Sequence, residues 1–131
     1  MLSGTLLAES IGVGAELRID GLTVTNIYRQ DQPDEPPGMP ATWTVIEFQA
    51  DDDRADELAQ KLASVMIAEG GWYADFGVGG DHVVVFAGRV FRYRAGDEVG
   101  RAAATEYGVS VGCPLPLRVP PPAVQDWLLR R

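Results

Sequence analysis

The chain has 131 residues, of which 46% are hydrophobic and 23% are charged, and its formal net charge is −8. These values indicate one globular domain with one core and exclude wholesale disorder. The acidity argues against a nucleic-acid partner, which needs clustered cations, and against an anionic membrane surface. No stretch holds the roughly 18 apolar residues that a membrane-spanning helix needs, so no membrane partner is expected.

The cysteine count and the first residues bear on location. Cys113 is the only cysteine, so no intramolecular disulfide can form, and a disulfide-stapled secreted domain is excluded. The first residues lack a basic stretch followed by a long apolar run, so no signal peptide is expected. A cytoplasmic location is the resulting prediction.

The N-terminal part predicts a helix and a strand ahead of a proline-rich loop. Residues 3–10 are expected to form a short helix. Residues 22–29 alternate apolar with polar side chains and are rich in β-formers, which predicts a strand. Four of the nine prolines lie in the segment 30–41, and proline can neither continue a helix nor donate to a sheet.

Residues 42–112 form a compact body without proline. Thr42 to Ala50 predicts a strand because it is rich in β-branched and aromatic residues. Apolar residues then recur with helical spacing over 53–68, and Gly70-Gly71 ends that helix. Residues 72–78 predict the next strand.

The run HVVVFAGRVFRYR, from His82 to Arg94, is too long for one ordinary strand. A hairpin that turns at Ala87-Gly88 is the preferred interpretation, and one bent strand is the alternative. Asp97 is expected to cap a second helix, with Val99, Ala103 and Tyr107 on its apolar face. The segment 113–131 holds the remaining prolines and is expected to end in a short helix.

This order of elements predicts an α+β fold. We expect a two-layer sandwich in which two main helices cover one face of an antiparallel sheet. The arrangement is that of a permuted ferredoxin-like fold, in which the strand at 22–29 supplies an edge antiparallel to the strand at 42–50.

Strand parity divides the side chains between the two faces of this sheet, although a one-residue slip inverts each assignment. The more apolar sets, which include Phe91 and Tyr93, are expected to lie against the helices. The opposite face mixes aromatic and charged side chains, and these are the candidate binding residues: Trp43, Glu47, Tyr73, Asp75, His82, Phe86, Arg92 and Arg94. Such a patch indicates a second copy, another protein or a small-molecule ligand, unless the proline segments and the tail cover it.

His82 is the only histidine and the first candidate for acid–base chemistry near neutral pH. Parity allows it to contact Asp75 across the hairpin. Arg92 and Arg94 would clamp a carboxylate or phosphate, or pair with Glu47 and Asp75. None of these residues is assigned a catalytic role.

No motif predicts a metal or a cofactor. Consecutive aspartates at Asp51–Asp53 are typical of a helix start, where the helix dipole favours them, and no calcium-loop pattern accompanies them. The glycines of Gly77–Gly80 lie between two strands, whereas a nucleotide cradle needs a strand before and a helix after.

The block GGWYADFGVGGDHVVVFAGRVFRYRAGDEVGRAAATEYG, with WTVIEFQADDDRADELA before it, resembles a group of small uncharacterised proteins from GC-rich bacterial genomes. The resemblance implies a stable fold and brings no catalytic residues. The leading hypothesis is therefore a non-enzymatic binding or protein-interaction domain that self-associates through the mixed face. The alternatives are an acidic inhibitor or immunity-type protein with a basic partner, and a small hydrolase or isomerase that uses His82 and Asp75.

Overall fold

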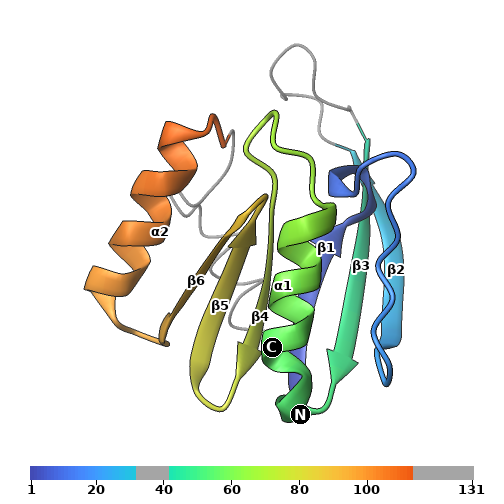
Figure 1. Cartoon of the computed structure of the whole chain (residues 1–131), viewed down its shortest axis with the longest axis horizontal. Coiled ribbons are helices and arrows are strands. Elements are labelled where there is room, and N and C mark those ends of the chain that lie inside the picture. Colours follow the sequence, from blue (N-terminus) through green and yellow to red (C-terminus); the bar gives the residue numbers. More distant parts are fainter. Residues whose placement is uncertain (32–41, 114–131) are drawn as a thin grey trace.

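The computed structural model describes residues 1–31 and 42–113. Within these residues, six strands form one open antiparallel sheet in the order β2-β3-β1-β4-β5-β6, and two α-helices pack on it (Figure 1). The predicted α+β class and the antiparallel sheet are confirmed. The predictions for the proline-rich loop from residue 32 onward and for the terminal helix after residue 113 lie outside the described residues.

The first strand, β1 (Leu2–Leu7), occupies the middle of the sheet, and a short 3₁₀ turn follows at Ala8–Ser10. The predicted helix over 3–10 is therefore wrong. Two features suit this segment to a central strand. Leu2 and Leu6 are buried on the same face. At Gly4, an added Cβ would lie only 2.3 Å from the carbonyl oxygen of Asp75, so glycine lets β1 approach its neighbour closely.

The next three elements follow the sequence prediction. They are β3 (Thr42–Ala50), α1 (Ala55–Val65) and β4 (Tyr73–Val78). Because β3 and β4 each pair antiparallel with β1, they are parallel to one another, and α1 connects them across β1. This split β-α-β unit is the part of the molecule that corresponds to a ferredoxin-like sandwich.

The second strand, β2 (Thr23–Asp31), forms one edge of the sheet and pairs antiparallel with β3, as predicted. Its register shifts between Val24 and Asn26, which marks a β-bulge. At the opposite edge, β5 (Asp81–Phe86) and β6 (Arg89–Arg94) form a hairpin. The preferred hairpin interpretation is confirmed, and the single bent strand is excluded.

The second helix, α2 (Glu98–Ser110), starts at the predicted cap, because the Asp97 carboxylate accepts hydrogen bonds from the backbone N–H groups of Val99 and Gly100. Its buried residues are Ala104 and Gly108, whereas Val99 and Ala103 of the predicted apolar face are exposed.

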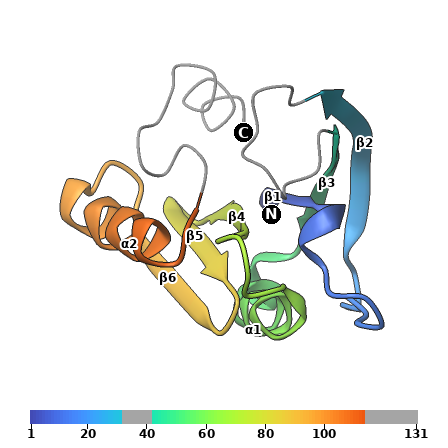
Figure 2. The same ribbon diagram turned by 90° about the horizontal axis from the view of Figure 1, so that it is seen from above.

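The two helices lie on opposite faces of the sheet, which corrects the prediction that both cover one face (Figure 2). Successive residues of a strand point to opposite faces. Val83 and Val85 of β5 pack in the cluster that contains the buried residues of α1, whereas Val84 and Phe86 pack with Ala104 of α2. The prediction failed because β5 is apolar on both faces, which requires a cover on each side. We refer to these two sides as the α1 face and the α2 face.

Candidate functional site

A hydrogen-bonded chain of three side chains lies on the α2 face, across β4, β5 and β6. Nε2 of His82 lies 2.9 Å from Oδ2 of Asp75, and Nδ1 of His82 lies 2.9 Å from the hydroxyl oxygen of Tyr93. The predicted contact between Asp75 and His82 is thus present. Sequence reasoning missed Tyr93, which it assigned to the other face.

Strand register brings these three residues together. The two-residue turn of the β5–β6 hairpin places His82 opposite Tyr93. Asp75 of β4 lies opposite Val84, two positions along β5 from His82 and on the same face. The chain is largely withdrawn from solvent, because Asp75 is 1% exposed and Tyr93 is 9% exposed. The His82 side chain is the most accessible of the three, at 17%.

Burial raises the pKa of Tyr93 from its ordinary 10.0 to about 12, an effect that Asp75 reinforces and Arg101 opposes. The phenol therefore keeps its proton at neutral pH and can donate to Nδ1 of His82. With Nδ1 as the acceptor, Nε2 carries the ring proton and donates to the Asp75 carboxylate. Each bond of the chain then has one donor and one acceptor.

This arrangement limits what the cluster can do chemically. A general base needs a ring nitrogen within reach of its substrate, and both nitrogens of His82 are engaged inside the protein. A nucleophilic tyrosine needs a lowered pKa, whereas burial raises the pKa of Tyr93. The geometry therefore fits a structural role, in which buried polar groups satisfy one another and join three strands.

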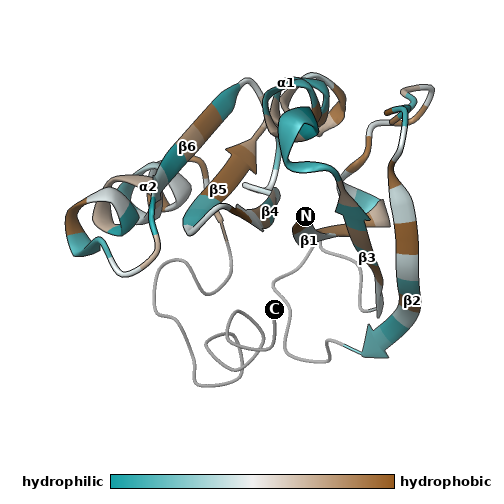
Figure 3. Ribbon diagram, turned by 90° about the horizontal axis from the view of Figure 1, so that it is seen from below, coloured by the Kyte–Doolittle hydropathy of each residue, from teal (hydrophilic) through white to brown (hydrophobic). Residues whose placement is uncertain are grey.

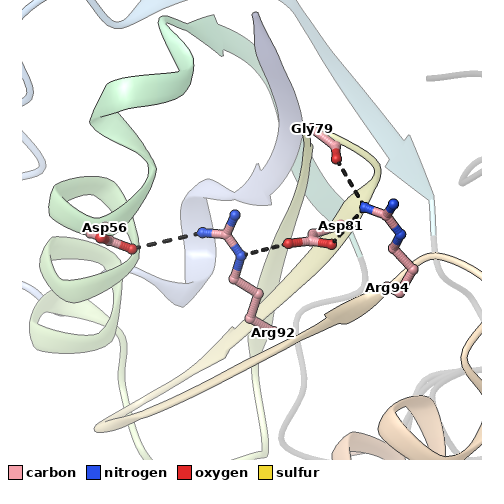
Figure 4. Close-up of polar contacts among 5 residues, drawn as sticks. All are labelled: Asp56, Gly79, Asp81, Arg92 and Arg94. Atoms are coloured by element: carbon pink, nitrogen blue, oxygen red, sulfur yellow. Dashed lines mark hydrogen bonds and ion pairs between the residues drawn. The ribbon is translucent and has the colours of Figure 1, made fainter.

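The arginines predicted for this site lie elsewhere. Arg92 and Arg94 are on the α1 face, where both approach the carboxylate of Asp81 (Figure 4). Arg92 Nε lies 2.9 Å from Asp81 Oδ2, and a guanidinium nitrogen of Arg94 lies 3.6 Å from Oδ1. Arg92 also lies 3.8 Å from a carboxylate oxygen of Asp56 at the start of α1.

The prediction that Arg92 and Arg94 share a face with His82 and pair with Glu47 or Asp75 is wrong. The prediction placed the more apolar side chains of each strand on one helix-covered face. It therefore assigned Phe91 and Tyr93 of β6 to the same face as Val83 of β5. Instead they meet α2 on the other face. The hydrogen bond from Arg92 lowers the pKa of the Asp81 carboxyl.

The aromatic members of the predicted mixed face are mostly buried. Trp43 is 6% exposed and packs edge-on against Trp72, with ring centroids 5.9 Å apart. Phe86 is 1% exposed and contacts the rings of Tyr73 and Tyr107. These residues form parts of the core, so they do not make an open patch.

The remaining predicted residue, Glu47, lies on β3 opposite Thr5 of β1 and Asn26 of β2. Its Oε1 accepts a hydrogen bond of 3.1 Å from Nδ2 of Asn26. Glu47 therefore holds the edge strand and is not part of the Asp75–His82–Tyr93 cluster.

Sequence reasoning did not consider the outer edge of β2 as a functional surface. Eight of the nine β2 residues are exposed, and Val24 and Ile27 are the large apolar ones, at 49% and 60% exposed. Among the described residues, no strand pairs with the side of β2 that faces away from β3. Figure 3 shows hydrophobic bands on this outermost strand.

Comparisons of the chain with protein-family models, with curated proteins and with solved structures found no match. Within residues 1–31 and 42–113, no group of three or more His, Cys, Asp or Glu side chains is arranged to hold a metal ion. In the same part of the chain, no helix is both long and apolar enough to cross a membrane.

Proposed function

We propose that this chain is a non-enzymatic protein-interaction domain that binds an extended protein segment by adding it as a strand to the outer edge of β2. The observation that supports this proposal is the exposed nine-residue edge strand β2. Among the described residues, no strand pairs with its outer side. Alternate residues of an edge strand direct backbone N–H and C=O groups outward, where an added strand can pair with them.

This proposal replaces the mixed sheet face with the β2 edge as the binding surface. Trp43 and Phe86 are buried, and Arg92 lies on the other face. The acid–base groups of Asp75, His82 and Tyr93 are engaged with one another, which favours binding over catalysis. The hypothesis of an acidic inhibitor with a basic partner stays a prediction.

Apolar side chains add to the backbone pairing. Ile27 and Val24 lie opposite Ile46 and Phe48 of β3, so they continue the α1 face outward to the edge. A bound strand would find side-chain contacts on that face in addition to the backbone hydrogen bonds. Cross-strand apolar pairs of this kind contribute roughly 0.2–1 kcal/mol each.

The test uses a fluorescein-labelled peptide with the sequence TVTNIYRQD of residues 23–31 as an extended probe. We expect saturable binding, measured by fluorescence anisotropy. Because strand addition depends mainly on backbone hydrogen bonds, a β-forming probe is sufficient. The variant Ile27→Lys should weaken binding by about tenfold or more, since lysine on an edge strand opposes strand pairing.

The matched control is Val13→Lys, which places the same charge on a side chain that is fully exposed in the loop before β2. It should bind the peptide as the unmodified protein does. Equal binding by all three proteins, or by none of them, would contradict the proposed function.

A further inference from the structure

We propose that the outer edge of β2 selects an extended segment of another protein by charge as well as by backbone pairing, with an acidic residue of that segment opposite Arg29 and a basic residue opposite Asp31. The inference rests on the proposed function and specifies the chemistry of the partner. Read from its N-terminus, the added antiparallel strand carries a basic, an acidic and a β-branched apolar residue at alternate positions.

The side chains that would carry this selection share one face of β2. Beyond the β-bulge, pairing with β3 is regular from Asn26 to Asp31. Alternate residues of this stretch point to the same face, so Ile27, Arg29 and Asp31 line the α1 face, and all three are exposed. Figure 3 shows the change along this strand from a hydrophobic band to a hydrophilic end. An added strand therefore meets one apolar and two charged side chains in a fixed order.

The two charges of β2 have no counter-charge within the described residues. There, the side chain of Arg29 takes part in no hydrogen bond or ion pair, and the Asp31 carboxylate accepts one hydrogen bond, of 3.5 Å, from the hydroxyl of Thr42. Directly opposite the two charges in β3 lie Thr44 and Thr42, which are uncharged. The inner neighbour therefore leaves both charges to be matched from the outer side.

The arginines of the other edge strand are in the opposite situation. In β6, Arg92 and Arg94 also lie on the α1 face, but both approach the carboxylate of Asp81 in the neighbouring β5 (Figure 4). The chain thus matches the charges of β6 internally, whereas β2 leaves Arg29 available for a carboxylate of a bound strand.

A strand that does not match these charges would bind less tightly. It would take Arg29 and Asp31 partly out of water, and a desolvated charge without a partner costs free energy. A like charge directly opposite is destabilising, whereas an opposite charge contributes favourably. The two charged side chains thus discriminate against apolar and wrongly charged strands, which keeps an exposed edge from pairing indiscriminately.

The orientation of the added strand follows from the sheet. Each pair of neighbouring strands described here is antiparallel, and antiparallel pairing is slightly more stable per residue than parallel pairing. In an antiparallel strand, the residue opposite Asp31 comes first, and those opposite Arg29 and Ile27 follow at alternate positions. A parallel strand would need the same residues in the reverse order.

Two fluorescein-labelled peptides that differ only in the order of their charges test this inference with the full chain, by fluorescence anisotropy. The matched peptide, TTKTETITT, brings lysine opposite Asp31, glutamate opposite Arg29 and isoleucine opposite Ile27. The exchanged peptide, TTETKTITT, has the same composition and net charge but brings like charges together. We expect the matched peptide to bind at least about fivefold more tightly, because two attractive cross-strand pairs become repulsive in the exchanged peptide.

Exchanging the two charges of the protein should invert this preference. The double variant Arg29→Asp with Asp31→Arg keeps the net charge of −8 and should bind the exchanged peptide more tightly, by about the same factor. The matched control is Glu16→Arg with Arg18→Glu, which exchanges an exposed ion pair in the loop before β2 and should leave the original preference unchanged. A general electrostatic attraction to the protein cannot produce an inversion in the first variant alone.

The outcome also separates this inference from the proposed function. If the unmodified protein binds both peptides equally, or binds the exchanged one more tightly, β2 accepts strands without this charge selection. The inference then fails while the proposed function stands, and the same holds if only the peptide of residues 23–31 binds. An unchanged preference in Arg29→Asp with Asp31→Arg would also overturn the inference. If no peptide binds, both fail.

Discussion

At the covered end of the sheet, no residue of β4 or β5 is exposed, whereas eight of the nine residues of β2 are exposed. The covered end contains the buried hydrogen-bonded chain of Asp75, His82 and Tyr93. Among the described residues, β2 pairs with β3 alone, and β6 at the other edge pairs with β5 alone. One sheet thus combines a part whose groups satisfy one another with a part whose backbone can still be paired. On the proposed function, the stability of the fold and its binding to a partner would depend on different strands.

The strongest test of this difference is at Gly4, where β1 meets β4. Gly4→Ala would bring a Cβ within 2.4 Å of Cβ of Phe76, and two paired backbones cannot yield this space cheaply. We expect a loss of more than about 3 kcal/mol in the free energy of unfolding, or failure to fold. Urea denaturation measures the loss.

Gly77→Ala on β4 is the matched control, because the nearest atom to its added Cβ would be 3.8 Å away. It should change stability by less than about 1 kcal/mol. If Gly4→Ala were no more destabilising than Gly77→Ala, the close approach of β1 to β4 would be refuted.

Tyr93→Phe removes the hydroxyl partner of His82 from the covered end. The unpaired ring nitrogen should cost about 1–2 kcal/mol of folding free energy, measured by urea denaturation. Tyr28→Phe makes the same chemical change in β2, where no described residue is hydrogen-bonded to the hydroxyl, and should have almost no effect. Equal losses from both substitutions would mean that the hydrogen bond to His82 does not contribute.

The pH dependence of unfolding gives a second signal from the same residue. The pKa of Tyr93 is raised from 10.0 to about 12 in the folded protein. Below pH 10 the phenol is protonated in both states and the contribution is complete. Between about 10 and 12 the unfolded chain loses its proton first, so stability falls as pH rises, by at most about 3 kcal/mol. Tyr93→Phe should show a shallower decline over this window, and an equally steep decline would contradict the raised pKa.

The smallest expected effect on folding is at the β2 edge. Ile27→Lys should change the free energy of unfolding of the monomer by no more than about 0.5 kcal/mol, because the side chain is 60% exposed. The measurement is urea denaturation at a protein concentration low enough to exclude association. A large loss would show that Ile27 supports the core and would remove the basis for using it as an interaction probe.

The sequence predicted the elements with strong local signals. Helical spacing around Leu58 and Leu62 identified α1, and Asp97 identified the start of α2. The N-terminal strand was missed because LSGTLL lacks the β-branched content of β3, and its strand conformation comes from two neighbours that lie far along the chain.

One of the two contacts in the polar cluster was also predicted from the sequence. The contact between Asp75 and His82 followed from parity, and Tyr93 could have been added from the turn alone. A two-residue turn at Ala87-Gly88 places Phe86 opposite Arg89, and counting back along both strands places His82 opposite Tyr93. Apolarity was the weaker guide, because it presumes that one face holds all the helices. The exposure of β2 depends on which strand ends at the sheet edge, which no local pattern reports.

The position of β1 has a consequence for the order of folding. Its two partners are β3, whose pairing residues lie about forty positions later, and β4, about seventy positions later. Contacts of such long range slow folding, since the chain entropy of loop closure is lost before pairing compensates for it. The β2-β3 and β4-β5-β6 hairpins can form early from local contacts. We therefore expect the insertion of β1 between them to be the slow step that joins the two halves into one sheet.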